Sequence, residues 1–295
     1  MTEIRSVAVL GGGQMGSGIA HVCAAAGFDT VVREVTAAMC QRAQHSVERS
    51  LARAVERGKL AADARDAALG RVRYATELEA LAECDLVIEA VVEDLEVKNR
   101  AWRELDAVCA PATVFASNTS SLTIAAMAAA TARADRVVGL HFFNPVPVMR
   151  LVEVVRTVTT SDETVARAFA FARAIGKEPI AAKDVSGFVV NLLLVPYLFD
   201  AITQLERGVA SVHDLDAGMR LGAGHPMGPL QLCDFVGLDT LYRIGEIMFA
   251  EYRERRYAPP PLLRRMVLAG LHGRKSGRGF YDYAEDPPVP SRLGI

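Results

Sequence analysis

The feature that most constrains the fold of this chain is a glycine-rich turn between a short apolar run and an alanine-rich stretch. The segment reads SVAVLGGGQMGSGIAHVCAAAG and places Gly-x-Gly-x-x-Gly at Gly11, Gly13 and Gly16. In such a turn one glycine permits the tight bend, one lets the backbone approach a diphosphate, and one lets the helix pack on the strand. The diphosphate then lies at the positive end of the helix. The sequence therefore predicts a dinucleotide-binding βαβ unit.

An acidic residue at the end of the next expected strand indicates which dinucleotide is bound. Glu34 lies in the run TVVREV, about 20 residues beyond the glycine turn. A carboxylate there accepts hydrogen bonds from ribose hydroxyls and repels a 2′-phosphate. We therefore predict NAD as the cofactor, and the neighbouring Arg33 leaves some use of NADP open.

The first half of the chain alternates β-branched runs with alanine-rich stretches, as in a parallel sheet built from βαβ units. The expected strands are SVAVL, TVVREV, LVIEAV, TVFAS, RVVGLHF and LVEVV. The segment 36–74 is too long for one crossover helix, so we expect two helices separated near Gly58. After Asp184 the apolar spacing becomes helical. The prediction is a Rossmann-type α/β domain with a mostly parallel sheet over residues 1–183, with its helical excursion at 36–74, followed by an all-α C-terminal domain over residues 184–295.

Composition narrows the class of protein. The 295 residues are 51% hydrophobic and 23% charged, with a formal net charge of −2, which indicates a globular protein and gives no reason to expect nucleic-acid binding. Neither a run of about 18 apolar residues nor a secretory signal is visible, so we expect no membrane association. The five cysteines form no CxxC motif and no Cys/His cluster, so neither disulfides nor a metal site is expected. The chain is predicted to be cytoplasmic.

A histidine at the end of a strand is the candidate catalytic group. The segment GLHFFNPVP takes His141 from an apolar run into a rigid Pro-Val-Pro. Nicotinamide chemistry moves a hydride, so the protein has to supply a proton transfer, and histidine ordinarily titrates near neutral pH. Glu153, flanked by valines in LVEVV, would fix the tautomer of the ring and stabilise an imidazolium. The alternatives are a hydrogen-bonded core histidine and an ordinary ion pair of Glu153.

Four longer segments, SNTSSLTIAAMA, GLHFFNPVPVMRLVEVV, DVSGFVVNLLLVPYL and GAGHPMGPLQLCDFVGLD, occur in this order along the chain. Together they resemble the 3-hydroxyacyl-CoA dehydrogenases, particularly the bacterial 3-hydroxybutyryl-CoA dehydrogenases. The resemblance runs from the first strand to GRKSGRGFYDY, which is practically the whole chain. It implies an NAD-dependent (S)-3-hydroxyacyl-CoA dehydrogenase that interconverts a short-chain 3-hydroxyacyl-CoA and its 3-oxo form. It also implies a homodimer formed through the C-terminal domain.

The resemblance implies roles for single residues as well. His141 and Glu153 stand at the positions of the acid–base pair. Ser120 stands where a serine hydrogen-bonds the reacting oxygen, and Asn191 where an asparagine completes the substrate site. The cofactor-binding residues that we expect are Gly11, Gly13, Gln14, Met15, Gly16, Glu34, Ala90, Glu93, Lys98, Asn118, Ser120, Asn144 and Lys275.

Three arginines in the helical excursion are candidate substrate-binding residues. Arg49, Arg53 and Arg57 recur every four residues and therefore share one helix face. In the resembled family, basic residues of this region meet the phosphates of coenzyme A. The alternative is a solvated face, which Glu48 and Glu56 would help to balance.

Two departures from the family pattern leave the acyl carrier open. Leu192 follows Asn191 where the family often has arginine, and Gly224 stands where asparagine is usual. Both lie near the expected substrate side, so an acyl-carrier-protein thioester or a sugar acid such as gulonate remains an alternative substrate. A non-catalytic, crystallin-like protein is a further alternative, and the intact set of four catalytic residues argues against it.

Overall fold

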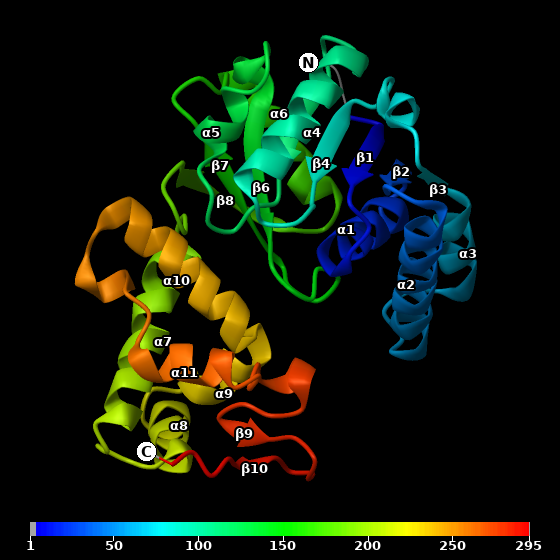
Figure 1. Cartoon of the computed structure of the whole chain (residues 1–295). Coiled ribbons are helices and arrows are strands. Elements are labelled where there is room, and N and C mark those ends of the chain that lie inside the picture. Colours follow the sequence, from blue (N-terminus) through cyan, green and yellow to red (C-terminus); the bar gives the residue numbers. More distant parts are fainter. Residues whose placement is uncertain (1–3, 295) are drawn as a thin grey trace. The chain divides into compact units, whose positions relative to one another are not determined.

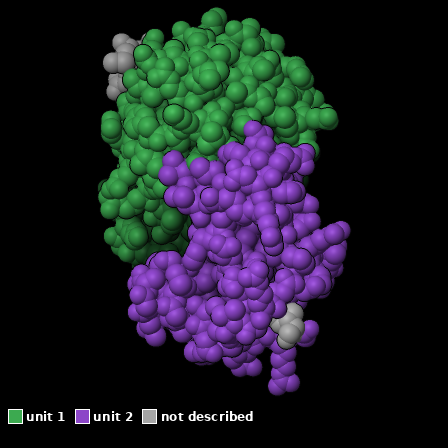
Figure 2. Space-filling view, turned by 90° about the vertical axis from the view of Figure 1, so that its left-hand side faces the viewer, with its two compact units in different colours: residues 1–188 green, residues 189–295 purple. Residues whose placement is uncertain are grey.

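The computed structural model describes residues 4–294 of the chain. The chain divides into two compact units, of which the first ends at Phe188 and the second begins at Val189 (Figures 1 and 2). The sequence places the domain boundary between residues 183 and 184, and residue 183 is the last residue of the final strand of the first unit. Residues 184–188 therefore lead from that strand to the end of the first unit.

The first unit is built on an eight-stranded sheet with the strand order β3-β2-β1-β4-β5-β6-β7-β8. Neighbouring strands are parallel, except that β6 and β7 pair antiparallel. The strands are β1 (Ser6–Leu10), β2 (Asp29–Arg33), β3 (Val72–Ala75), β4 (Leu86–Glu89), β5 (Val114–Ser117), β6 (Val137–Phe142), β7 (Leu151–Arg156) and β8 (Glu178–Lys183). The predicted α/β class with a mostly parallel sheet is confirmed, and all six expected strands are present.

The sequence missed the two strands that form the edges of this sheet. β3 overlaps the end of the segment 36–74, for which only two helices were expected, and the second of those helices ends at Gly70. β8 reads EPIAAK, with a charge at each end and a proline at its second position. Edge strands of natural sheets commonly carry charges and proline, because their outer side has to resist further pairing. The continuous apolar run that reveals the inner strands is therefore absent from both.

The helices of the first unit connect these strands. They are α1 (Gln14–Ala25), α2 (Ala37–Glu56), α3 (Ala62–Gly70), α4 (Leu95–Val108), α5 (Ile124–Ala128) and α6 (Asp162–Ala174), with short 3₁₀ turns η1 (Leu78–Leu81) and η2 (Ala134–Arg136). Between α2 and α3 the chain turns at Gly58, whose φ of +65° is left-handed, so the expected break is at the expected glycine. Among residues 4–294 no helix is both long and apolar enough to cross a bilayer.

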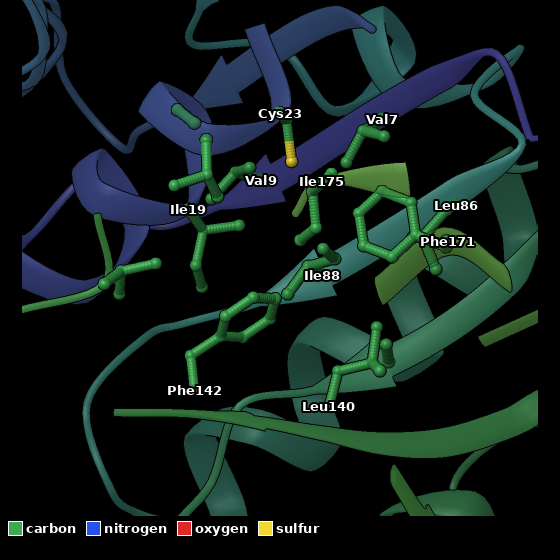
Figure 3. Close-up of a cluster of buried hydrophobic side chains, with 14 of the residues drawn as sticks. Val7, Val9, Ile19, Cys23, Leu86, Ile88, Leu140, Phe142, Phe171 and Ile175 are labelled. Atoms are coloured by element: carbon green, nitrogen blue, oxygen red, sulfur yellow. The ribbon is translucent and has the colours of Figure 1, made fainter. Parts of the chain in front are cut away.

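Alternate side chains of the strands enter two separate cores. Val7 and Val9 of β1 belong to the core cluster that also contains residues of α1, α2 and α6, part of which is drawn in Figure 3. Ala8 and Leu10, which alternate with them, belong to a second cluster with residues of α4 and α5. Helices therefore cover both faces of the sheet, and a polar group at a strand end is positioned by packing on each face.

The second unit is mostly helical. Its helices are α7 (Val190–Glu206), α8 (Val212–Gly222), α9 (Pro229–Val236), α10 (Leu238–Tyr252) and α11 (Pro261–Leu268), with 3₁₀ turns η3 (Arg255–Tyr257) and η4 (Arg274–Ser276). Two short strands, β9 (Tyr281–Asp282) and β10 (Val289–Pro290), pair antiparallel near the C-terminal end. A core of buried residues from α7, α9, α10 and α11 joins these helices. Apart from that small hairpin, the expected helical character is confirmed.

A buried carboxylate connects helix α9 with the C-terminal segment of the second unit. Asp234 in α9 accepts hydrogen bonds from the backbone N–H groups of Phe280 and Tyr281 and from the hydroxyl of Tyr283. Burial raises the pKa of Asp234 to about 6, although these donors work in the opposite direction. The carboxylate thus supplies acceptors for two consecutive backbone N–H groups at the start of β9.

Candidate active site

The glycine turn is shaped by three different environments. Gly11 has a φ of +94°, and a side chain on it would come within 2.8 Å of the carbonyl oxygen of Ala90. A Cβ on Gly16 would lie 1.8 Å from the carbonyl oxygen of Gly11. A Cβ on Gly13 would meet no atom of the described chain within 4 Å. Gly11 and Gly16 are thus required by the fold, whereas Gly13 borders open space at the start of α1.

The N-terminus of α1 is prepared for an anion. Gly13 is the N-cap residue and has no side chain to cap the helix, and the first turn of the helix contains no acidic residue. The first N–H groups of a helix need acceptors, and the helix dipole favours a negative charge there. Met15, in the same turn, packs against the first core cluster. These residues fit the diphosphate of a dinucleotide.

Glu34 directly follows β2 and lies against the glycine turn. Its Oε1 accepts a hydrogen bond from the backbone N–H of Gly12 at 2.7 Å, and its Oε2 accepts one from Val35 N at 3.3 Å. The neighbouring Arg33 donates from Nε to the carbonyl oxygen of Thr76 at 3.0 Å. The structure thus brings the predicted acidic residue to the predicted turn, and its contact with a ribose stays a prediction.

His141 and Glu153 form a buried pair. They are directly opposite each other in the antiparallel register of β6 and β7. His141 Nδ1 lies 2.5 Å from Glu153 Oε2, and the two residues are 5% and 0% exposed. A carboxylate can only accept, so Nδ1 donates the proton and Nε2 is left as the proton-accepting atom of the ring. This is the arrangement that a histidine base needs.

Aromatic rings pack against the imidazole. The ring of Phe143 lies 4.5 Å from that of His141 between centroids, and the ring of Phe188 lies 5.6 Å from it. Phe188 is buried and has a φ of +48°, a left-handed conformation that costs a residue with a side chain about 1–3 kcal/mol. The surrounding packing has to outweigh that cost, which fixes the ring beside His141.

Ser120 lies in the loop that follows β5, next to the strand of His141. β5 and β6 are neighbours in the sheet, with Ser117 opposite Gly139. Asn118 Oδ1 accepts a hydrogen bond from Phe142 N at 2.9 Å, which ties this loop to the end of β6. The predicted catalytic residues of the first unit therefore come from adjacent strand ends.

Glu93 and Lys98 belong to one ionic network. Lys98 is 1% exposed, and its Nζ lies 2.6 Å from Glu89 Oε1 and 3.2 Å from Glu93 Oε2. Glu89, which the sequence analysis missed, also accepts a hydrogen bond from Ser117 Oγ at 2.6 Å. A buried strand carboxylate with a lysine nine positions later was the available signal, because a buried charge needs a partner. The expected contact of Glu93 and Lys98 with the cofactor stays a prediction.

The turn after β6 is connected to the start of α1. Gln14 Nε2 donates to Asn144 Oδ1 at 3.1 Å, so two expected cofactor residues contact each other. The Asn144–Pro145 peptide bond is cis. Lys177, which the sequence analysis also missed, is buried and donates from Nζ to the carbonyl oxygens of Val146 and Met149.

The remaining predicted residues lie elsewhere in the chain. Arg49, Arg53 and Arg57 are exposed along α2 and its C-cap, and within the described residues no carboxylate pairs with their guanidinium groups. Asn191 lies in the first turn of α7, in the second unit. Lys275, also in the second unit, forms an ion pair with Asp239 at 2.5 Å. In residues 4–294 no cluster of three metal-ligating side chains was found.

The glycine turn, Glu34, Glu93, Ser120 and His141 lie at the carboxyl ends of β1, β2, β4, β5 and β6, respectively. The strand order reverses between β1 and β4, and open α/β sheets bind ligands at such a point. A glycine turn before an uncapped helix start, with a His–Glu pair at the same end of the parallel strands, is the arrangement of an NAD-dependent dehydrogenase.

Comparison with known proteins identifies the family. Residues 6–185 match the model of the 3-hydroxyacyl-CoA dehydrogenase NAD-binding domain, and residues 187–283 match the C-terminal domain of the same family. The chain belongs to the 3-hydroxyacyl-CoA dehydrogenase family.

Individual relatives are similar over nearly their whole length. The chain is 52% identical to a 3-hydroxybutyryl-CoA dehydrogenase of Mycobacterium tuberculosis strain H37Rv, over 95% of this chain and 99% of that protein. It is 46% identical to a 3-hydroxybutyryl-CoA dehydrogenase of Bradyrhizobium diazoefficiens, with coverages of 98% and 99%. The crystal structure of an (S)-3-hydroxybutyryl-CoA dehydrogenase from Ralstonia eutropha matches with a TM-score of 0.91 and 42% identity, over 96% of this chain and 100% of that one.

Proposed function

We propose that this chain is an (S)-3-hydroxyacyl-CoA dehydrogenase that interconverts a short-chain 3-hydroxyacyl-CoA and its 3-oxo form. The observation that carries the proposal is the buried His141–Glu153 pair, which lies at the same end of the strands as the dinucleotide turn. The three relatives described above are all named 3-hydroxybutyryl-CoA dehydrogenases, which supports a four-carbon acyl group.

The proposed mechanism uses the free nitrogen of His141. In the oxidation direction Nε2 takes the proton of the 3-hydroxyl group, and Glu153 stabilises the imidazolium through Nδ1. The hydroxyl of Ser120 donates a hydrogen bond to the reacting oxygen and keeps it in line with His141. NAD, bound at the glycine turn, supplies the site with a hydride acceptor. The same residues return the proton in the reduction direction.

The cofactor is held by the glycine turn, by Glu34 on the adenosine ribose, and by Asn144 beside the start of α1. Open space at Gly13 and the uncapped start of α1 support this part of the proposal. Arg33 donates from Nε to the carbonyl oxygen of Thr76, and the Glu34 carboxylate would repel a 2′-phosphate; both support a preference for NAD.

The coenzyme A moiety is proposed to meet the arginines of α2. Their exposure, and the lack of carboxylate partners for them among residues 4–294, support this role, since such guanidinium groups are suited to phosphates. Asn191 is proposed to take part in substrate binding and Lys275 in cofactor binding, both on the basis of the family resemblance.

The chain is further proposed to act as a homodimer in the cytoplasm. The second unit has strongly exposed apolar side chains at Leu193, Leu221 and Leu268, which a partner could cover. The five cysteines of the chain are all free thiols, which fits a reducing compartment such as the cytoplasm. Light scattering of the purified protein tests the dimer.

The function is tested by following the loss of NADH absorbance with acetoacetyl-CoA. Replacing His141 with Ala should lower turnover by at least about 100-fold, because the proton acceptor is lost, while NADH still binds. Glu153→Gln keeps the size of the side chain and should also lower turnover, since the imidazolium loses its counter-charge. Near-normal turnover in the His141→Ala variant would remove this histidine from the mechanism.

A further inference from the structure

Three consecutive residues of the loop that carries Ser120 donate hydrogen bonds to one carboxylate oxygen. Glu93 Oε1 accepts hydrogen bonds from Thr119 Oγ1 at 2.5 Å, from Ser120 N at 3.2 Å and from Ser121 Oγ at 3.0 Å. Three consecutive residues thus share one acceptor atom, and the middle residue is the one that the proposed mechanism uses. Hydrogen bonds to an ionised acceptor are stronger than neutral ones, so this contact restricts the whole loop.

A buried ion pair supports that carboxylate. Lys98 Nζ lies between Glu93 and Glu89, and both Lys98 and Glu89 are almost completely buried. Burial by itself raises the pKa of Glu93, but the charge of Lys98 and the hydroxyl donors of the loop outweigh it, so this pKa lies below its usual range. Glu93 is therefore ionised at neutral pH, as the three hydrogen bonds require.

The same network joins two strand ends. Glu89, the last residue of β4, accepts hydrogen bonds from Ser117 Oγ at 2.6 Å and from Val91 N at 2.8 Å. Ser117 is the last residue of β5, directly before the Ser120 loop. Lys98 thus pairs with one carboxylate that anchors the base of the loop and with another that holds its tip.

We propose that Glu93 is a positioning residue that acts through Ser120, with Lys98 and Glu89 as its buried support. The proposal rests on the proposed function, because it requires that Ser120 contacts the reacting oxygen. It assigns Glu93 a different task from the place along the cofactor that family resemblance implies. A catalytic group displaced by about 1 Å can cost about 100-fold in rate, so a loosened loop reduces turnover without removing the hydroxyl itself.

A double-mutant cycle separates this role from a general structural one. The variants are Glu93→Gln, Ser120→Ala and the combination, assayed with NADH and acetoacetyl-CoA. Glu93→Gln has nearly the same size but carries no charge for Lys98, and we expect kcat to fall by at least about 10-fold. In the Ser120→Ala background the same change should lower kcat by less than about twofold, since the group it positions is already absent. The dissociation constant of NADH, measured by fluorescence, should change by less than about twofold in Glu93→Gln.

Asp85→Asn is the matched control. Asp85 Oδ2 also accepts hydrogen bonds from three donors, Arg5 N, Ser6 N and Ser6 Oγ, each at 2.9 Å. Asp85 directly precedes β4, so it lies at the amino-terminal ends of the strands, away from the Ser120 loop. Its replacement should change stability, leave kcat within about twofold, and have the same small effect with and without Ser120.

Three results would overturn the proposal. Equal losses of kcat from Glu93→Gln with and without the Ser120 hydroxyl would show that Glu93 does not act through Ser120. A large loss of NADH affinity in Glu93→Gln would return Glu93 to the cofactor. Near-normal turnover of Ser120→Ala alone would contradict the role of Ser120 in the proposed function and this proposal with it. If Glu93→Gln does not fold, Ser121→Ala, which removes one of the three donors, is put through the same cycle and should show a smaller loss that also disappears without the Ser120 hydroxyl.

Discussion

At the residue scale, two glycines of the turn are needed for different reasons: Gly16 for the fold and Gly13 for the proposed binding of the cofactor. A Cβ on Gly16 would overlap a backbone oxygen, which cannot move aside as a flexible side chain can. A Cβ on Gly13 would enter space that the described chain leaves open. Both glycines belong to the same motif, yet the protein occupies the space beside the Cα of Gly16 and leaves the space beside the Cα of Gly13 open.

This difference predicts two distinct phenotypes. Gly13→Ala should leave the thermal unfolding temperature within a few degrees of the unmodified protein but weaken NADH binding by at least about 10-fold, because the methyl group enters the cofactor's space. Gly16→Ala should lower stability by a few kcal/mol, since backbone has to shift to relieve the overlap. Calorimetry and NADH titration on the same preparations check both. Full NADH affinity in a folded Gly13→Ala variant would contradict the position of the diphosphate.

At the element scale, the sequence revealed inner strands and missed edges. The six inner or next-to-edge strands have apolar, β-branched runs, whereas β3 reads VRYA and β8 reads EPIAAK. The His141–Glu153 pair was predictable because each residue interrupts an apolar strand, and the register of β6 and β7 then places them opposite each other. Lys177 was not found, because its contacts join segments about 30 residues apart, which periodicity does not report. Glu89 was missed although its partner Lys98 is only nine positions away.

Helix α2 carries the element-scale prediction. Reversing the charge of Arg49 and Arg53 should raise the KM for acetoacetyl-CoA by about 10-fold at low salt, and the effect should shrink at high ionic strength because exposed charges are screened. Arg57, at the C-cap of α2, is left unchanged to spare the helix end. Reversing Arg100 and Arg103, exposed on α4, is the matched control and should leave the KM unchanged. An unaltered KM in the α2 variant would favour a merely solvated face and keep a different carrier open.

At the scale of the whole molecule, each unit has a hydrophobic core of its own. The single tryptophan, Trp102, is fully buried in the first unit and packs on Phe115. Its fluorescence therefore reports unfolding of the first unit, even when both units are present in the full chain.

A buried histidine makes that unfolding depend on pH. Burial, and then the charge of Lys177, lowers the pKa of His21 to about 4, and its Nδ1 is 2.7 Å from Ser50 Oγ. The unfolded chain takes up a proton near pH 6.5 that the folded chain takes up only near pH 4, so the free energy of unfolding should fall as the pH drops between these values. The loss attributable to His21 is up to about 3 kcal/mol, at about 1.4 kcal/mol per pKa unit. Urea unfolding at pH 7 and pH 5, followed by tryptophan fluorescence, should show a smaller pH dependence for His21→Gln. An identical dependence in the variant would contradict the burial argument.

The one antiparallel pairing in the sheet has a consequence for how the chain can change over time. Because His141 and Glu153 sit on consecutive strands, thirteen successive residues encode the whole acid–base pair. A residue inserted or deleted within the connecting loop lengthens or shortens only the excursion between the strands, provided that the ladder is kept. A slip of the ladder by one residue, by contrast, would send the glutamate to the opposite side of the sheet. The length of the connection can therefore vary between relatives, whereas the register of the two strands that flank it is constrained.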